Sequence, residues 1–131
     1  MCGIIGAVTK SAIEPVLEGL GRLEYRGYDS SGISILSNNE IQTIKAEGKL
    51  SKLKQRLSVQ PIDGDCCIGH TRWATHGRAN VTNAHPHQCG QVSVVHNGII
   101  ENYLNLKQQL IQWGHHFNSS TDSEVIPHLI N

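Results

Sequence analysis

Five apolar runs along the chain predict β-strands. Residues 4–8 are apolar almost throughout and predict a buried first strand. Residues 32–44 read GISILSNNEIQTI, two runs of β-branched residues around the polar residues 37–40, and predict a hairpin. Residues 66–73 (CCIGHTRW) and 92–100 (VSVVHNGII) each carry an apolar run into polar residues. We therefore expect polar side chains of these two segments at the ends of strands.

Four other segments carry apolar residues at helical spacing. Their apolar positions are Ile13, Val16, Leu17 and Leu20; Leu50, Leu53 and Leu57; Tyr103, Leu106, Leu110 and Trp113; and Val125, Ile126, Leu129 and Ile130. The first helix is predicted to begin at Ser11, because Ser11-Ala-Ile-Glu14 matches a capping box and Pro15 falls in the first turn. The second is predicted to end near Pro61 and the third at Gly114. Helices mixed with hairpin-forming strands, without an internal repeat, indicate an α+β fold.

The composition of the chain excludes several classes of function but says little about the fold. A chain of 131 residues is long enough for one domain with a hydrophobic core. Lysine plus arginine and aspartate plus glutamate both number 11, so the balanced charge gives no reason to expect nucleic acid as a partner. No run approaches the ~20 apolar residues of a membrane span, and no signal peptide is evident. We therefore expect a cytoplasmic protein with reduced cysteines.

The second residue is the first candidate for chemistry. Cys2 follows the initiator Met1, and removal of Met1 would leave Cys2 as the N-terminus. Its α-amine, with an ordinary pKa of about 7.7–8.0, would then share a Cα atom with the thiol, so nucleophile and general base would already be together. The competing interpretation is an inert cysteine buried in a strand.

Three later segments hold polar residues that suit the binding of a small charged molecule. Arg72 has a planar guanidinium that can grip a carboxylate through two hydrogen bonds, although a surface salt bridge is the commoner role of a lone arginine. Asn97 and Gly98 follow an apolar strand and could form either a turn or an oxyanion hole. Asp122 stands at a helix start, either as an N-cap or as a carboxylate for a substrate ammonium.

Six motifs together resemble one family. MCGIIG, LEYRGYDSSG, GHTRWATHG, NAHPH, VHNGIIEN and TDSEV occur in this order and are similar to the glutaminase domain of the glucosamine-6-phosphate synthases, the glutamine–fructose-6-phosphate aminotransferases (isomerising). The resemblance runs from residue 1 to residue 131. The opening motif is shared with related amidotransferases, whereas LEYRGYD and TRWATHG distinguish the chain from the phosphoribosyl-pyrophosphate amidotransferases.

The resemblance implies a fold and a mechanism. Class II glutamine amidotransferases of the N-terminal nucleophile hydrolase type are four-layer αββα sandwiches, with helices outside two packed antiparallel sheets. Cys2 would attack the glutamine side-chain amide with its own amine as base, giving a γ-glutamyl thioester and ammonia. The resemblance also implies that Asn97 and Gly98 donate hydrogen bonds to the oxyanion. Arg72 would bind the glutamine α-carboxylate and Asp122 its α-ammonium. Thr75 and His76 would line the glutamine pocket, Trp73 would gate the exit of ammonia, and Arg26 would support the nucleophile.

The same resemblance suggests that residues 1–131 are the N-terminal part of a longer glutaminase domain. The family's domain is considerably longer than this chain, and the complete enzyme adds sugar-isomerase modules that bind fructose 6-phosphate. We therefore expect glutamine as the partner of these residues and fructose 6-phosphate only as a partner of the absent modules. The full-length form is expected to be a homodimer, and the isolated chain is expected to be marginally stable with little turnover.

Three other functions remain open from the residues alone. A non-catalytic glutamine-binding fragment would keep the pocket without the rigidity for turnover. A protein similar to the phosphoribosyl-pyrophosphate amidotransferases would supply ammonia to another acceptor. A metal-binding module would use the cysteines and histidines at positions 66, 67, 70, 85, 87, 89 and 96, but the paired spacings of zinc motifs are absent and adjacent cysteines fit one ion poorly. We expect neither a metal nor a cofactor.

Overall fold

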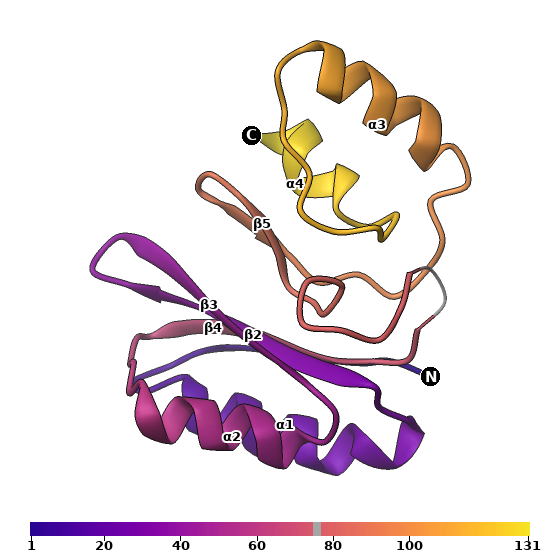
Figure 1. The fold of residues 1–131 in the computed structure, drawn as a ribbon. Coiled ribbons are helices and arrows are strands. Elements are labelled where there is room, and N and C mark those ends of the chain that lie inside the picture. The colour runs from indigo at the N-terminus through magenta and orange to yellow at the C-terminus, as the bar shows by residue number, and fades with distance from the viewer. Residues whose placement is uncertain (75–76) are drawn as a thin grey trace.

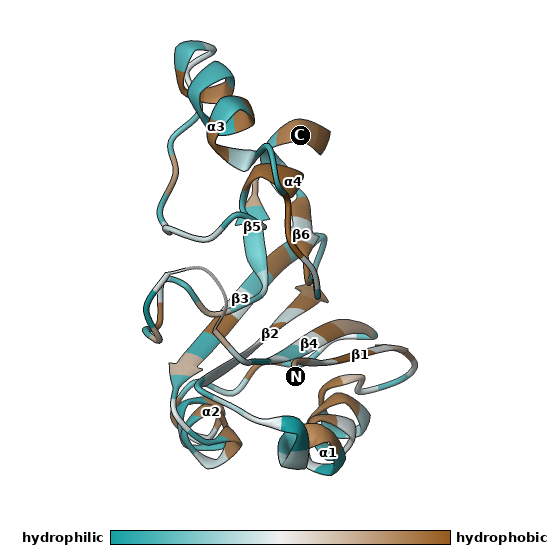
Figure 2. Ribbon diagram, turned by 90° about the vertical axis from the view of Figure 1, so that its right-hand side faces the viewer, coloured by the Kyte–Doolittle hydropathy of each residue, from teal (hydrophilic) through white to brown (hydrophobic). Residues whose placement is uncertain are grey.

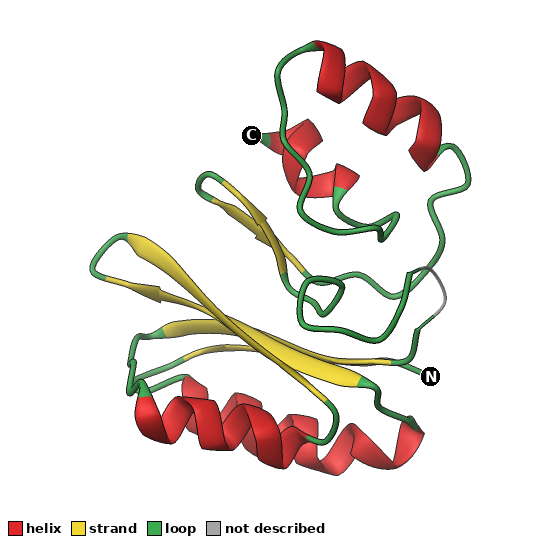
Figure 3. Cartoon of the chain, viewed as in Figure 1, coloured by secondary structure: helices red, strands yellow, loops and turns green. Residues whose placement is uncertain are grey.

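A four-stranded antiparallel sheet forms the centre of the fold. The computed structural model describes residues 1–74 and 77–131. The strands are β1 (Gly3–Val8), β2 (Ser30–Ser37), β3 (Glu40–Glu47) and β4 (Cys66–Arg72), in the spatial order β1-β4-β2-β3. Every neighbouring pair is antiparallel (Figure 3). The first strand, the hairpin and the strand that starts at Cys66 are confirmed.

The first strand is an edge strand and not the fully buried strand that its apolar run predicted. β1 pairs only with β4, and its side chains alternate between the two faces of the sheet. Ile5 and Ala7 pack against the hydrophobic core, whereas Ile4 and Val8 point the other way and Val8 is 84% exposed. The prediction of complete burial is wrong because helices cover only one face of this strand.

The β2–β3 hairpin turns where the sequence predicted. Ser37 and Glu40 are paired across the ladder, and the two intervening residues, Asn38 and Asn39, have φ angles of 51° and 62°. Two successive positive φ angles are typical of the tight turn that matches the right-handed twist of a hairpin, and asparagine adopts them more easily than most residues. The side chains of the turn therefore determine the register of the whole hairpin.

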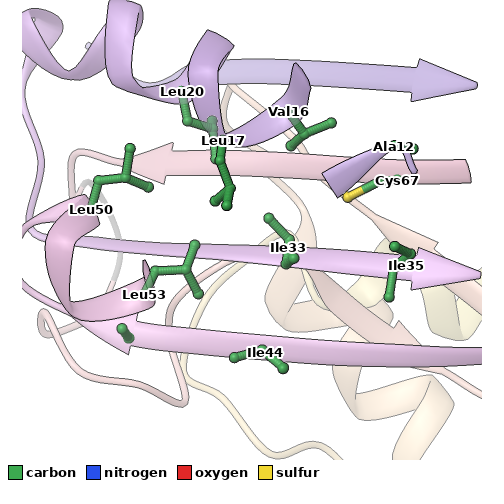
Figure 4. Packing of buried hydrophobic residues seen from close by; sticks show 11 residues of the cluster. Ala12, Val16, Leu17, Leu20, Ile33, Ile35, Ile44, Leu50, Leu53 and Cys67 are labelled. Atoms are coloured by element: carbon green, nitrogen blue, oxygen red, sulfur yellow. The ribbon is translucent and has the colours of Figure 1, made fainter. Parts of the chain in front are cut away.

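Two helices cover one face of the sheet. α1 (Ile13–Leu23) and α2 (Leu50–Val59) direct their apolar residues at β2, β3 and β4 (Figure 4). The buried core consists of Ala12, Val16, Leu17, Leu20, Ile33, Ile35, Ile44, Ala46, Leu50, Leu53 and Cys67. Both helices and their apolar faces were predicted from periodicity alone, and both predictions are confirmed. Burial of such side chains contributes about 1.5–3 kcal/mol each, which makes this layer the main source of stability.

The start of α1 differs from the predicted capping box. Ser11 has a φ of 55°, and its hydroxyl donates to the Asp63 carboxylate at 3.1 Å. Ala12 is the N-cap residue, without a side-chain cap, and its backbone N–H donates to Gly64 O at 2.9 Å. The capping-box prediction is wrong because the segment before β4 supplies the contacts that a local cap would have made. Pro15 does lie in the first turn.

A second pair of layers lies on the other face of the sheet. β5 (His87–Cys89) and β6 (Val92–Val94) form a short antiparallel hairpin. α3 (Tyr103–Gln112) and α4 (Val125–Ile130) lie outside it (Figure 1). From α1 and α2 outward, the order is helices, sheet, sheet, helices, so the expected four-layer α+β architecture is confirmed. β5 was not predicted, because its sequence, HQC, has no apolar alternation and is hydrophilic (Figure 2).

The interface between the two sheets combines polar contacts with apolar side chains, since Leu36, Ile68 and Val92 line a pocket there beside Ser34 and Ser93. Ser93 of β6 donates to the hydroxyl of Ser34 on β2 at 2.7 Å, and Thr43 of β3 donates to the Gln88 side chain of β5 at 2.8 Å. The two sheets are therefore joined by side-chain hydrogen bonds, in contrast to the apolar contact under α1 and α2.

The C-terminal helices are only partly as predicted. α3 ends at Gln112 with Trp113 as its C-cap residue, and Gly114, with a φ of 93°, follows the cap as the sequence predicted. Of the predicted apolar face only Leu110 is buried. In α4, Val125 is buried, whereas Leu129 and Ile130 are exposed and His128 is buried instead. The predicted apolar face of α4 is wrong at these positions because the helix faces the β5–β6 hairpin and α3 through Val125 and His128.

A short 3₁₀ turn, η1 (Glu24–Arg26), follows α1 and leads the chain back to the sheet. Within the described residues, no helix combines the length and the apolar character needed to cross a bilayer.

Candidate functional site

A cavity of about 340 Å³ lies where the N-terminus meets the end of β4. The pairing of Gly3 with Thr71 brings Cys2 next to Arg72, since the two strands run antiparallel. The cavity is lined by Met1, Cys2, His70, Arg72, Trp73, His85, His96, Asn97, Gly98, Ile99, Thr121, Asp122 and Ser123. Six residues proposed from the sequence are therefore brought together. A larger and more open groove of about 960 Å³, between α2 and the segment before β5, contains none of the residues proposed from the sequence.

The Cys2 thiol is held at the edge of this cavity by the backbone after β4. The N–H of Trp73 donates to Cys2 Sγ at 3.1 Å. Cys2 O in turn accepts a hydrogen bond from Asn97 Nδ2 at 3.2 Å. The N-terminal ammonium of Met1 donates a hydrogen bond to the backbone oxygen of Arg26 at 2.5 Å, and this bond positions the N-terminus. Cys2 is partly exposed, which leaves the sulfur accessible from the cavity.

Asn97 and Gly98 lie in the connection between β6 and α3, with a bend at Gly98. β6 ends at Val94 and does not pair with the segment that follows, so the interpretation as a hairpin turn is wrong. The Asn97 side chain is oriented by His70, whose Nε2 donates to Asn97 Oδ1 at 2.8 Å. A Cβ atom on Gly98 would lie 2.8 Å from His96 Nε2. A side chain at this position would therefore displace the His96 ring.

His70 keeps Asn97 in place without adding charge. Burial lowers the pKa of His70 from 6.5 to about 4, although the hydrogen bond to Asn97 acts in the opposite direction. The ring is therefore neutral near pH 7 and acts as an N–H donor. Its hydrogen bond directs the amide NH₂ of Asn97 toward the backbone oxygen of Cys2.

Arg72 is buried and does not form a surface salt bridge. The residue is 3% exposed, and Nη1 and Nη2 donate to the backbone oxygens of Arg78 and Gly77 at 3.1 and 3.2 Å. Asp29 Oδ1 lies 3.8 Å from Nη1. The alternative of a solvent-exposed ion pair is therefore wrong. A buried guanidinium at the wall of a cavity is suited to an anionic ligand group.

Asp122 does not cap the last helix. α4 begins at Val125 with Glu124 as its N-cap residue, and no side chain caps it. The Asp122 carboxylate, 3% exposed, instead accepts the backbone N–H of Ile100 at 2.7 Å. This bond joins the segment after β6 to the segment before α4. The N-cap interpretation is therefore wrong, and the carboxylate lies at the cavity wall.

Trp73 lies at the rim of the cavity and is 55% exposed. Its ring covers Gly27, which has a φ of 112° and would place a Cβ atom 2.3 Å from the indole. Thr75 and His76, the two remaining residues proposed from the sequence, lie outside the described residues.

Asp29 was given no role from the sequence, although it lies in the family motif LEYRGYDSSG. Its carboxylate accepts hydrogen bonds from the Ala74 backbone N–H and from the Ser30 hydroxyl, and it is the ion-pair partner of Arg72. Asp29 thus links the end of β4 to the start of β2. The only signal in the sequence was the concentration of polar residues in LEYRGYDSSG.

The histidines of the site form a buried group. The rings of His70 and His85 are stacked with centroids 4.3 Å apart, and His85 and His87 meet edge to face at 4.5 Å. Burial lowers the pKa of all three, that of His87 to about 3 and that of His85 further. His87 Nε2 lies 2.8 Å from Thr121 Oγ1. These rings serve as neutral hydrogen-bonding groups in a polar interior.

Comparisons with known proteins agree with this geometry. Residues 58–131, more than half of the chain, match the model of the glutamine amidotransferase domain family. The chain is 52% identical over 131 residues to the glutamine–fructose-6-phosphate aminotransferase (isomerizing) of Mesorhizobium japonicum, and 52% identical over 134 residues to that of Clostridium tetani. The alignments cover 99% and 100% of the chain but 22% of each relative.

The fold has solved counterparts of similar shape. The glutamine phosphoribosylpyrophosphate amidotransferase of B. subtilis, in complex with ADP and GMP, superposes with a TM-score of 0.81 at 28% identity, over 99% of this chain and 29% of that one. A structure described as the allosteric regulatory enzyme of purine biosynthesis superposes with a TM-score of 0.82 at 29% identity, over the same shares of the two chains. On the family match, the high identity and the shared fold, the chain belongs to the glutamine amidotransferase family.

Proposed function

We propose that residues 1–131, within the complete protein, hydrolyse the side-chain amide of glutamine with Cys2 as the nucleophile. The observation that carries the proposal is the convergence of Cys2, Asn97, Gly98, Arg72 and Asp122 on one cavity, although they come from opposite ends of the sequence. The thiol can attack the amide carbon of glutamine, and the two N–H donors can stabilise the oxyanion that forms. The cation and the anion can bind the α-carboxylate and the α-ammonium of the same molecule.

The proposed reaction begins once Met1 is removed. The Cys2 α-amine takes the proton of the Cys2 thiol, and the sulfur attacks the amide carbon of glutamine. The tetrahedral oxyanion receives hydrogen bonds from the Asn97 side chain and the Gly98 backbone N–H. The carbon–nitrogen bond then breaks, the amine returns its proton to the leaving nitrogen, and ammonia departs. Water hydrolyses the resulting γ-glutamyl thioester to glutamate and free Cys2.

Arg72 and Asp122 are proposed to orient the substrate. The Arg72 guanidinium would bind the α-carboxylate of glutamine, and the Asp122 carboxylate would bind the α-ammonium. Both side chains are buried and already held by backbone groups, so little conformational entropy is lost when they bind. In the same proposal, Arg26 supports the N-terminal segment, and Thr75 and His76 contribute to the glutamine pocket.

We further propose that the ammonia is used to convert fructose 6-phosphate to glucosamine 6-phosphate. The relatives at about 52% identity are named for that acceptor, whereas the phosphoribosylpyrophosphate enzyme is 28% identical. The chain spans 22% of the length of those relatives, so residues that bind the sugar phosphate would lie in sugar-isomerase modules outside it. Trp73, at the rim, would gate the exit of ammonia. The complete protein is proposed to be a cytoplasmic homodimer, in keeping with four free cysteines.

Processing of Met1 tests the proposed mechanism. The chain is produced as a fusion whose cleavage leaves either Cys2 itself or one additional serine before Cys2 as the N-terminus. The extra residue moves the free amine up to ~3.8 Å along the backbone and off the Cα that carries the thiol, so glutamate release should be abolished.

The measurement is repeated in a chimera, so that the result does not depend on the isolated chain. In the chimera, residues 1–131 replace the matching segment of the Mesorhizobium japonicum relative. Equal glutaminase activity in the two forms of the chimera would contradict the role of the Cys2 α-amine. Fructose 6-phosphate added to the active chimera provides the readout for the acceptor.

A further inference from the structure

Cys89, His115 and His128 lie together on the side of the β5–β6 hairpin that faces α3 and α4. One possible ligand atom of each residue lies within 4.8 Å of those of the other two. Among residues 1–74 and 77–131, this is the only group of three or more cysteine, histidine or acidic side chains with a spacing suited to one metal ion. None of the three lines the cavity beside Cys2.

Three separate elements bring these residues to one place. Cys89 is the last residue of β5, directly before the turn at Gly90. His115 follows the end of α3, where the N–H of His115 donates to Leu110 O at 3.0 Å and the N–H of Gly114 donates to Ile111 O at 3.0 Å. This pair of bonds is the Schellman motif, which sets the direction of the chain after a helix. His128 is buried in α4. The position of each residue is therefore determined by backbone structure.

The two imidazoles face each other through the same kind of nitrogen. His115 Nδ1 and His128 Nδ1 are 2.9 Å apart, which requires one of the rings to carry a proton between them. A divalent cation can take the place of that proton and accept both lone pairs. Two imidazole nitrogens bound to one tetrahedral zinc lie ~3.3 Å apart, given Zn–N bonds of about 2.0–2.1 Å, so only a small opening of the pair is needed.

A second observation points to a metal at Nδ1 of His128. The other nitrogen of this ring, Nε2, is buried without a hydrogen-bond partner, and Glu124 Oε1 lies 3.7 Å away. If a cation occupied Nδ1, the ring would have to carry its proton on Nε2, and that N–H would face the Glu124 carboxylate. A carboxylate behind a histidine ligand in this way is a regular feature of metal sites.

The supporting residues are themselves fixed. Glu124 accepts the backbone N–H groups of Asn118 and Ser119 at 2.8 and 2.7 Å, so its carboxylate cannot easily turn away. The ring of Phe117 stacks on His128 with centroids 4.2 Å apart and holds its plane. A rigid histidine with an oriented carboxylate behind it is suited to bind a metal.

We propose that Cys89, His115 and His128 form a binding site for a zinc-type divalent cation that fastens the β5–β6 hairpin to α3 and α4. One thiolate and two imidazoles are ligands that Zn²⁺ prefers, whereas Ca²⁺ and Mg²⁺ prefer oxygen. A water molecule would complete the tetrahedron. Cys89 and His115 are only partly buried, which leaves a path for the ion. The site departs from the expectation of a metal-free domain, because residues 89, 115 and 128 form no short sequence motif.

Cobalt titration of the purified chain tests the proposal. Co²⁺ replaces zinc in such sites and gives a thiolate-to-metal charge-transfer band and intense visible bands when it is tetrahedral. We expect both signals to saturate at one equivalent under reducing conditions and to disappear when Zn²⁺ is added. The Cys89→Ser variant should lose the charge-transfer band, whereas Cys66→Ser and Cys2→Ser, which alter cysteines outside the group, should keep it.

Two further measurements keep the result decisive. Glu124→Gln should retain the band but bind Co²⁺ about 10- to 100-fold more weakly, as is common when a residue behind a histidine ligand is changed. The titration is repeated with the chain carried on a soluble fusion partner that has no metal ligands, which excludes loss of signal through association. Absence of the charge-transfer band in that fusion, or an identical band in Cys89→Ser, would overturn the proposal.

Discussion

The two faces of the central sheet differ in how they contact the next layer. On the face toward α1 and α2, β2 contributes Ile33 and Ile35, both fully buried among apolar side chains (Figure 4). On the face toward β5 and β6, the same strand contributes Gly32 and Ser34. A Cβ atom on Gly32 would lie 2.2 Å from His85 O, so the backbone there comes unusually close to the next layer. The apolar face is filled by side chains, and the polar face is joined by hydrogen bonds.

Because of this difference, residues that stabilise the fold and residues that line the candidate site alternate along the same strand. Successive residues of a strand point to opposite faces, so a strand can serve a hydrophobic core and a polar site at the same time. β4 shows the same division, since Cys67 belongs to the core and His70 orients Asn97. We infer that substitutions on one face should mainly change the free energy of unfolding and those on the other mainly the binding of glutamine.

The largest effect on stability is expected on the apolar face. Ile33→Ala should lower the free energy of unfolding by about 2–5 kcal/mol, because it removes a fully buried side chain and leaves a cavity. Denaturant unfolding followed by circular dichroism measures the change. A loss below 1 kcal/mol, by the same scale, would show that this layer is not the main source of stability.

The next largest effect is expected in the site. Arg72→Lys keeps the charge but loses the planar pair of donors, so KM for glutamine should rise by on the order of 10- to 150-fold, equivalent to about 1.5–3 kcal/mol, with a smaller change in kcat. Glutamate release at varied glutamine concentrations gives both constants in the chimera described above. Arg22→Lys, at an exposed ion pair on α1, is the matched control and should behave like the unmodified protein. Unchanged KM in Arg72→Lys would remove Arg72 from the substrate site.

The pH dependence of stability should belong to the polar face. Burial lowers the pKa of His70 to about 4 and that of His87 to about 3, from 6.5, so between those values the unfolded chain binds more protons than the folded one. The free energy of unfolding should therefore fall as pH drops below about 6.5, by up to ~1.4 kcal/mol per pH unit for each histidine, and should level off above it.

Two variants assign that dependence to one face. His87→Gln should reduce the slope, because the side chain no longer titrates, whereas Ile33→Ala should shift the whole curve without changing its slope. Denaturation at pH values from 7 down to 5 provides the comparison. An identical slope in His87→Gln would contradict the assignment of the pH dependence to the buried histidines.

The smallest effect is expected from a single hydrogen bond between the sheets. Ser34→Ala removes the hydroxyl that accepts from Ser93 and lies 2.6 Å from Thr43 Oγ1. The free energy of unfolding should fall by about 0.5–1.5 kcal/mol, because the Thr43 hydroxyl keeps its hydrogen bond to Gln88. A loss as large as that of Ile33→Ala would show that the two faces contribute equally.

The sequence could predict the elements whose own residues determine them. The apolar periodicity of α1 and α2 and the two asparagines of the hairpin turn act locally, and these elements were found. The start of α1 was missed because Ser11 bonds to Asp63, far along the chain. β5 was missed because its three residues, HQC, carry no periodic apolar signal. Contacts between distant segments decide both cases.

The site shows the same limit. Arg72, Asn97 and Asp122 could be proposed because their motifs resemble those of the glutaminase domains; their residue types alone left structural roles open. Their burial, and the residues that hold them, such as His70 and Asp29, could not be predicted, because these depend on how β4, β2 and the segment after β6 meet. The cluster of Cys89, His115 and His128 arises in the same way from three separate elements.

The most direct test of the central claim is chemical labelling of the nucleophile. An electrophilic analogue of glutamine, with a reactive carbon in place of the amide, is incubated with the chain from which Met1 has been removed, and the peptides are analysed by mass spectrometry. The account predicts one adduct, on Cys2, that free glutamine suppresses and that Arg72→Lys strongly slows. Modification of Cys66, Cys67 or Cys89 instead of Cys2, or labelling of Cys2 that glutamine does not suppress, would contradict the account.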